Sequence, residues 1–132
     1  MSTPRKVRSI AASGNWHHLL EQLCAFRDAR DWQQFHHPKD LAAAIAIEAG
    51  ELQEHFLWKT NAEIESGLGK VATLSKVTAE LADVLIFVLL LADRLGIDVD
   101  HAVKAKIRSN ARKYPVSKAK GRARKYTELD ER

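Results

Sequence analysis

The sequence contains few cysteine, proline and glycine residues: one, three and six, respectively, in 132 residues. A single cysteine excludes an internal disulfide framework, so Cys24 is expected to be a reduced core residue. The chain has no glycine-rich loop of the kind that cradles phosphates, and no segment alternates apolar and polar residues over the length of a strand. These absences favour an all-α protein.

Long apolar runs are also missing. The longest, Leu81 to Ala92, contains Asp83 and is shorter than the roughly 20 residues that cross a bilayer. The basic residues near the N-terminus are not followed by an apolar stretch, so no secretory signal is expected. We therefore predict a cytoplasmic protein with no membrane partner. Its length predicts one folded domain over residues 16–115, a polar arm at 1–15 and a charged, loosely ordered tail at 116–132.

Acidic residues are absent from residues 101–127, which contain ten lysines and arginines. The net charge of the whole chain is +4. Such an excess of positive charge indicates an anionic partner: a nucleotide, a nucleic acid or a phosphorylated metabolite.

Apolar residues recur at helical spacing in four segments. They predict helices over about 16–31, 39–58, 75–95 and 100–113, with a loop at 32–38 and a polar connection at 59–69. Asp40 is expected to cap the second helix, Gly96 to end the third and Pro115 to end the fourth. The predicted fold is a four-helix bundle-like protomer. The third helix is apolar on most of its circumference, so part of it is expected to pack against a second subunit.

Two pairs of acids lie inside otherwise apolar helical sequence: Glu48 with Glu51, and Glu80 with Asp83. Residues three apart lie on the same side of a helix, so each pair can direct two carboxylates at one point. Burying a lone carboxylate costs several kcal/mol, about as much as the penalties that force a buried acid to pair or become neutral. A cation is therefore expected beside Asp83.

Two other interpretations of the acids must be weighed. Exposed surface charge is expected for Glu54, but for Glu80 and Asp83 it would leave a large apolar face in water. A salt-bridge network with Lys76 or His55 is the second alternative, but four clustered acids with few bases repel one another.

A divalent metal relieves that repulsion better. All-oxygen ligands favour Mg²⁺, with Mn²⁺ as a substitute. A di-iron site would need Glu-x-x-His motifs, which neither pair offers, and the histidines lack zinc-like spacing.

At this point the motifs resemble a known family. The two acidic pairs, the Arg30-Asp-Trp-Gln-Gln-Phe-His36 string and the segment from Lys106 to Pro115 are similar to the MazG-like superfamily of all-α nucleoside triphosphate pyrophosphohydrolases. Its dCTP pyrophosphatase branch is the closer match, over about residues 16–115. Two departures are Ile47, where many members have a further glutamate, and Phe87, where the branch can have tyrosine.

The resemblance implies hydrolysis of a nucleoside triphosphate, with dCTP or a modified dCTP as the expected substrate, to the monophosphate and pyrophosphate. It implies Mg²⁺ ligands at Glu48, Glu51, Glu80 and Asp83, with Glu51 as the candidate base. The implied substrate-binding residues are Trp32, His36, Trp58, Lys59, Phe87, Lys106, Asn110, Arg112, Lys113 and Tyr114. From the residues alone, core packing of Trp32 and Trp58 and a solvated His36 stay open.

Other classes of function also stay open. The basic stretch from Lys104 to Lys125 could belong to a nucleic-acid-binding helical module, although nucleic acid is the less expected partner because that function leaves the four acids unexplained. A purely structural partner-binding bundle is the third alternative. The family implies a homo-oligomer, a dimer or a dimer-based tetramer, in agreement with the apolar third helix.

Overall fold

A computed structural model describes residues 15–130 of the chain. Every regular element in this range is a helix, which confirms the all-α class. The chain divides into two compact units, one ending at Ile97 and the other beginning at Asp98. The predicted polar arm lies almost entirely outside the described residues. Among residues 15–130, none of the helices combines the length and the apolar character that crossing a lipid bilayer requires.

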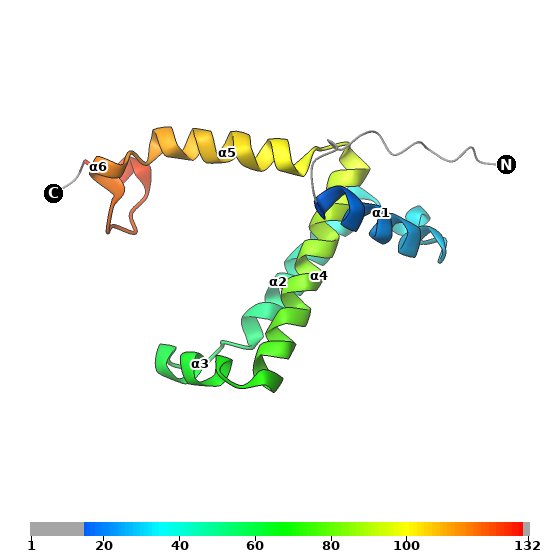
Figure 1. The fold of residues 1–132 in the computed structure, drawn as a ribbon, viewed down its shortest axis with the longest axis horizontal. Coiled ribbons are helices and arrows are strands. Elements are labelled where there is room, and N and C mark those ends of the chain that lie inside the picture. The colour runs from blue at the N-terminus through cyan, green and yellow to red at the C-terminus, as the bar shows by residue number, and fades with distance from the viewer. Residues whose placement is uncertain (1–14, 131–132) are drawn as a thin grey trace. The chain divides into compact units, whose positions relative to one another are not determined.

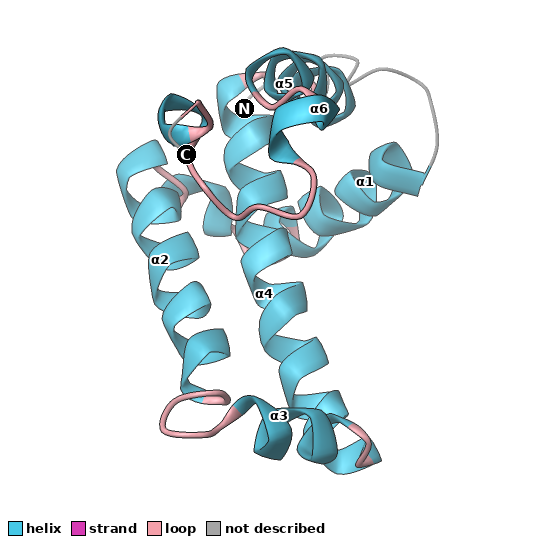
Figure 2. Cartoon of the chain, turned by 90° about the vertical axis from the view of Figure 1, so that its left-hand side faces the viewer, coloured by secondary structure: helices cyan, strands magenta, loops and turns pink. Residues whose placement is uncertain are grey.

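The first unit is organised around one long helix. Its elements are α1 (Asn15–Asp28), the 3₁₀ helix η1 (Trp32–Phe35), α2 (Pro38–Glu54), α3 (Asn61–Leu68) and α4 (Val71–Leu95). Helix α2 runs antiparallel to α4 and makes the most extensive contact with it (Figure 1). Helices α1 and α3 pack against opposite ends of α4, as Figure 2 also shows.

Local chemistry explains the ends of α2 and α4. Pro38 occupies the first turn of α2, where its missing N–H costs nothing, and His37 is the cap residue. The prediction that Asp40 caps α2 was wrong. Asp40 lies in the first turn, where its negative charge interacts favourably with the positive end of the helix dipole. Helix α4 ends at Gly96 as predicted. The φ of 68° at Gly96 is in the left-handed region that glycine adopts without steric cost.

The predicted connection at 59–69 is wrong, because residues 61–68 form α3. The Thr60 side chain accepts a hydrogen bond from the Glu63 backbone N–H, and Glu63 Oε2 accepts one from the Thr60 N–H at 2.7 Å. This reciprocal capping box starts a helix in a polar segment. The first two predicted helices were too long, since α1 ends at Asp28 and α2 at Glu54.

The core of the first unit lies where α1 and the start of α2 meet the C-terminal half of α4. Its buried apolar residues are Leu20, Cys24, Leu41, Leu89, Leu90 and Ala92. Arg27 is buried among them and pairs with Asp28 at 2.7 Å and Asp93 at 3.0 Å. Burial, assisted by the charge of Asp93, raises the pKa of Cys24 to about 11. The thiol is therefore protonated and unreactive near neutral pH, as expected of a core cysteine.

The second unit contains α5 (Val99–Lys113), α6 (Val116–Ala119) and the 3₁₀ helix η2 (Tyr126–Glu128). The Asp98 carboxylate caps α5 by accepting a hydrogen bond from the His101 N–H at 2.9 Å. Residues 116–130, for which the sequence predicted a loosely ordered tail, contain two short helices and the buried side chain of Leu129.

Candidate active site

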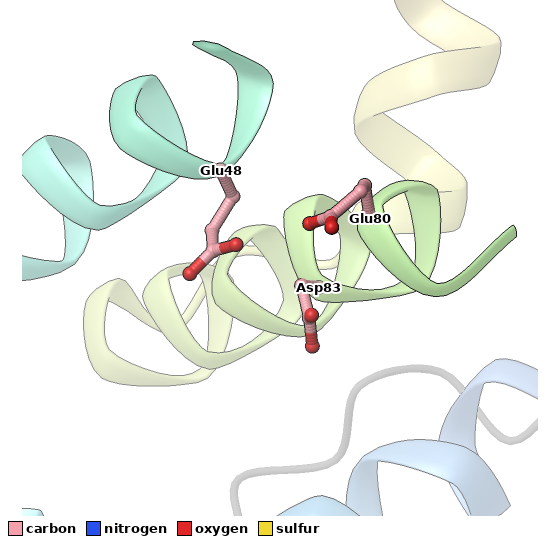
Figure 3. Close-up of side chains that lie close together, drawn as sticks. All are labelled: Glu48, Glu80 and Asp83. Carbon is pink, nitrogen blue, oxygen red and sulfur yellow. The ribbon is translucent and has the colours of Figure 1, made fainter. Parts of the chain in front are cut away.

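Three of the four predicted ligands converge. Glu48 projects from α2 toward α4, and Glu80 and Asp83 project from consecutive turns of α4 (Figure 3). One carboxylate oxygen from each lies within 4.8 Å of the others, and all three side chains are half-buried. The antiparallel packing of α2 and α4 brings together acids that are about 30 residues apart in the chain.

The electrostatics of this cluster are unfavourable without a cation. Burial raises the pKa of Glu48, and the charges of Glu51, Asp83 and Glu80 raise it further. Within residues 15–130, no lysine or arginine forms an ion pair with these carboxylates. The donor set is therefore all oxygen, without a permanently charged base to compensate it, and suited to a hard divalent ion.

Among the residues that the structure describes, His55 is the one basic side chain that pairs with these acids, with Nε2 3.7 Å from Glu80 Oε1. Of the two residues considered for a structural salt-bridge network, His55 pairs with an acid of the cluster. Lys76 forms no such pair within the described part of the chain. A single histidine, charged only when protonated, cannot neutralise three carboxylates. The signal for His55 was its position directly after α2, four residues after Glu51 and seven after Glu48, which continues the same helix face.

Glu51 lies one turn beyond Glu48 on α2 and is exposed. It is not among the three acids whose oxygens lie within 4.8 Å, although its charge contributes to the raised pKa of Glu48. Lys59, predicted to bind phosphate, donates from Nζ to the His55 carbonyl at 2.7 Å and so satisfies a backbone acceptor at the end of α2.

The aromatic residues predicted for the base pocket belong to the first unit, but their environments differ. Trp32 is 45% exposed and packs edge-on against Phe26, with ring centroids 5.8 Å apart. Trp58 is 93% exposed and has a φ of 63°, a conformation that costs a bulky residue roughly 1–3 kcal/mol. Plain core packing of either tryptophan is therefore wrong. Phe87 is half-buried on α4, one turn after Asp83.

His36 follows η1 and is half-buried, and its Nδ1 is buried without a hydrogen-bond partner within the described structure. Burial and then the charge of Arg27 lower the pKa of His36, so the ring is neutral at pH 7. A fully solvated loop histidine is therefore wrong. The ring can donate or accept a hydrogen bond without carrying charge.

The remaining predicted substrate residues belong to the second unit. Lys106, Asn110, Arg112 and Lys113 are exposed on α5, and Tyr114 follows its last residue. Lys106 lies in the middle of α5 and the other four residues lie at its C-terminal end, in a stretch without acidic residues from 101 to 127.

Comparison with known proteins agrees with this arrangement. Residues 43–129 match the MazG-like family, a range that includes all four acids. The chain belongs to the MazG-like family. The match begins after Trp32 and His36, so it does not support the predicted roles of these two residues.

Individual relatives extend the MazG-like match toward the N-terminus. dCTP pyrophosphatase 1 from Homo sapiens is 42% identical over 104 residues, which are 79% of this chain and 61% of the relative. The Rattus norvegicus protein is 41% identical over the same shares. This MazG-like chain thus spans about three fifths of the length of these curated relatives. A solved pyrophosphatase from Archaeoglobus fulgidus superposes with a TM-score of 0.73 at 40% identity, covering 80% of this chain and 96% of that one.

Proposed function

We propose that this protein is a Mg²⁺-dependent nucleoside triphosphate pyrophosphohydrolase that converts dCTP, or a modified dCTP, to the monophosphate and pyrophosphate. The observation that carries the proposal is the half-buried cluster of Glu48, Glu80 and Asp83, which lies inside the MazG-like match. About 40% identity to proteins named dCTP pyrophosphatase 1 supports the choice of substrate. Cleansing of the cytoplasmic nucleotide pool is the role that this reaction would serve.

The donor set fits Mg²⁺ because three carboxylate oxygens lie within 4.8 Å of one another and, among residues 15–130, no lysine or arginine pairs with them. Glu48, Glu80 and Asp83 would hold the ion, with Glu51 completing the set from the next turn of α2. When bound, Mg²⁺ neutralises phosphate oxygens and lowers the pKa of water. Mn²⁺ has the same preference for oxygen ligands and would substitute for it.

In the proposed reaction the oxygen of water bonds to the α-phosphorus, and the bridging oxygen leaves with pyrophosphate. Glu51 is exposed and ionisable, so its carboxylate can accept the proton that water releases. Lys59, Lys106, Arg112 and Lys113 supply positive charge for the phosphate oxygens. Trp32, Trp58 and Phe87 offer ring faces to the base, and neutral His36, Asn110 and Tyr114 offer hydrogen bonds to base or sugar.

A homo-oligomer, a tetramer built from dimers, is part of the proposal. The bundle-like protomer leaves large apolar side chains in solvent, including Ile47 at 62% and Leu81 at 57% exposure on the two helices that carry the acids. Such a surface beside a site is typical of an interface. Light scattering at micromolar concentration checks this, and a monomeric mass would contradict it.

The decisive experiment is a panel of canonical and 5-modified nucleoside triphosphates with Mg²⁺, in which pyrophosphate release is measured. Glu51→Gln is expected to lower kcat by about 100-fold, the usual contribution of a general base. Asp83→Asn is expected to weaken Mg²⁺ binding and so raise the Mg²⁺ concentration needed for half-maximal activity. Glu54→Gln is the matched control, because Glu54 is an exposed acid on the same helix outside the cluster.

Release of single phosphate would refute attack at the α-phosphorus. No release from any triphosphate, together with duplex affinity that falls steeply with salt, would favour the nucleic-acid-binding alternative instead.

A further inference from the structure

The tetrapeptide Ala-Arg-Lys-Tyr occurs twice in the second unit, at 111–114 and at 123–126. The first copy ends α5, and the second leads into η2. Helical periodicity does not reveal the repetition, because each copy is only four residues long.

The fold brings the two copies together. Pro115 has no N–H and ends α5, α6 adds a single turn, and Gly121 then adopts a φ of 76°, which only glycine adopts readily. The chain therefore turns back toward the end of α5, as the orange and red segments of Figure 1 show. The rings of Tyr114 and Tyr126 meet edge-on with centroids 6.0 Å apart, and Lys113 Nζ lies 5.1 Å from the Tyr126 ring centre.

The returning segment is held in place beyond the second copy. Leu129 is buried at 5% exposure, and Lys118 Nζ pairs with Asp130 Oδ1 at 2.5 Å. The tyrosine rings nevertheless stay accessible, at 37% for Tyr114 and 48% for Tyr126. The result is a cluster in which Lys113 and the two tyrosine rings lie together and stay accessible to solvent.

We infer that Lys125 and Tyr126 of the second copy bind the phosphate chain of the nucleoside triphosphate together with the first copy. This inference rests on the proposed function for the identity of the substrate. Lys125 is exposed and forms no ion pair within the part of the chain that the structure describes, and residues 101–127 contain no acid. Lysine ammonium groups and tyrosine hydroxyls can donate hydrogen bonds to a compact polyanion, and Lys125 is next in sequence to the paired ring of Tyr126. Lys125 and Tyr126 are therefore further substrate contacts.

Calorimetry with inorganic tripolyphosphate tests the inference without relying on catalysis. In the full-length protein, Lys125→Gln is expected to raise the Kd for tripolyphosphate about tenfold, the usual effect of losing one charge-assisted hydrogen bond. Lys39→Gln removes the same charge from an exposed site in the first unit and is expected to change the Kd by less than about twofold. An unchanged Kd for Lys125→Gln, or an equal loss for Lys39→Gln, would overturn the inference.

Gly121→Ala provides an independent variant. A Cβ at this position would meet nothing within 4 Å, so its effect is confined to the strained backbone at positive φ. It should weaken tripolyphosphate binding as Lys125→Gln does, because the second copy would no longer return to the first. Unchanged affinity in Gly121→Ala would show that bringing the two copies together is irrelevant to binding, and it would count against the inference.

Two further readouts separate the possible outcomes. If the wild-type protein hydrolyses dCTP, Lys125→Gln should raise KM with little change in kcat, because the lost contact is made in substrate and transition state alike. If it hydrolyses no triphosphate, the proposed function fails, but tripolyphosphate binding still reports on the cluster. A single-stranded oligonucleotide that binds more tightly than tripolyphosphate and depends on Lys125 would identify a nucleic-acid surface instead and refute the inference.

Discussion

Neutralising Glu48 should stabilise the metal-free protein. Each carboxylate in the cluster lies within 4.8 Å of the other two. At that separation two unit charges repel by about 1 kcal/mol in water and about 3.5 kcal/mol at an effective dielectric constant near 20. Because the side chains are half-exposed, solvent screening favours the lower value. Glu48→Gln removes two of the three repulsions and should therefore raise the free energy of unfolding by about 2 kcal/mol.

The assay is thermal unfolding at pH 8 in the presence of a chelator. For a chain of 132 residues, about 2 kcal/mol corresponds to a rise in Tm of roughly 6 °C. With excess Mg²⁺ the order should reverse: the wild-type protein gains stability by binding the ion, whereas Glu48→Gln gains little. The matched control is Glu54→Gln on the same helix, which should change neither value by more than about 1 °C because exposed surface charges contribute little.

One result would refute the reasoning. If Glu48→Gln lowered the Tm in chelator, Glu48 would be making a favourable contact in the metal-free protein, as a structural network with His55 requires. The three acids would then be part of the fold, and a cation would not be needed to explain them.

Three further predictions follow from other contacts. The pKa of Glu48 is raised above its ordinary 4.5, so the folded state binds this proton more tightly than the unfolded state does. As pH falls toward 4.5, the stability of the metal-free protein relative to Glu48→Gln should therefore increase, while the Mg²⁺-induced rise in Tm should shrink. Thermal unfolding measured across pH checks both trends. Arg27→Met leaves half-buried Asp93 without its partner and should cost about 3 kcal/mol in urea unfolding, whereas Asp28→Asn, at an exposed partner, should cost less than about 1 kcal/mol. Thr60→Ala removes one half of the capping box and should cost about 1 kcal/mol, with faster amide hydrogen exchange confined to α3.

The acidic cluster could be predicted from the sequence because its rule is local. Residues three apart share a helix face, so Glu80 and Asp83 had to project from the same side of α4. Glu48 joins them through tertiary packing, yet the apolar stripes of α2 and α4 already indicated that these helices would meet. Gly96 and Pro115 were predictable for the same reason, since each acts through its own backbone.

Features that depend on distant partners were not predictable. Trp58 was placed by periodicity inside a helix, whereas it follows α2 at positive φ with its ring in solvent. The burial of Arg27 needs Asp93, which lies 66 residues away. The return of residues 123–126 to the end of α5 needs the turn at Gly121, whose consequence is visible only once the rings of Tyr114 and Tyr126 are placed.

The missed helix α3 determines which acids can meet. In an antiparallel pair, residues at equal distances from the connection face each other. Glu48 lies six residues before the end of α2 and Glu80 nine residues after the start of α4, roughly 9 Å and 14 Å at 1.5 Å per residue. The turn at residues 55–58, which continues past the end of α2, makes up the difference. The capping box at Thr60 then fixes where the chain enters α3, and α3 packs on α4. A polar segment that composition marks as a mere connection therefore sets the register on which the carboxylate cluster depends.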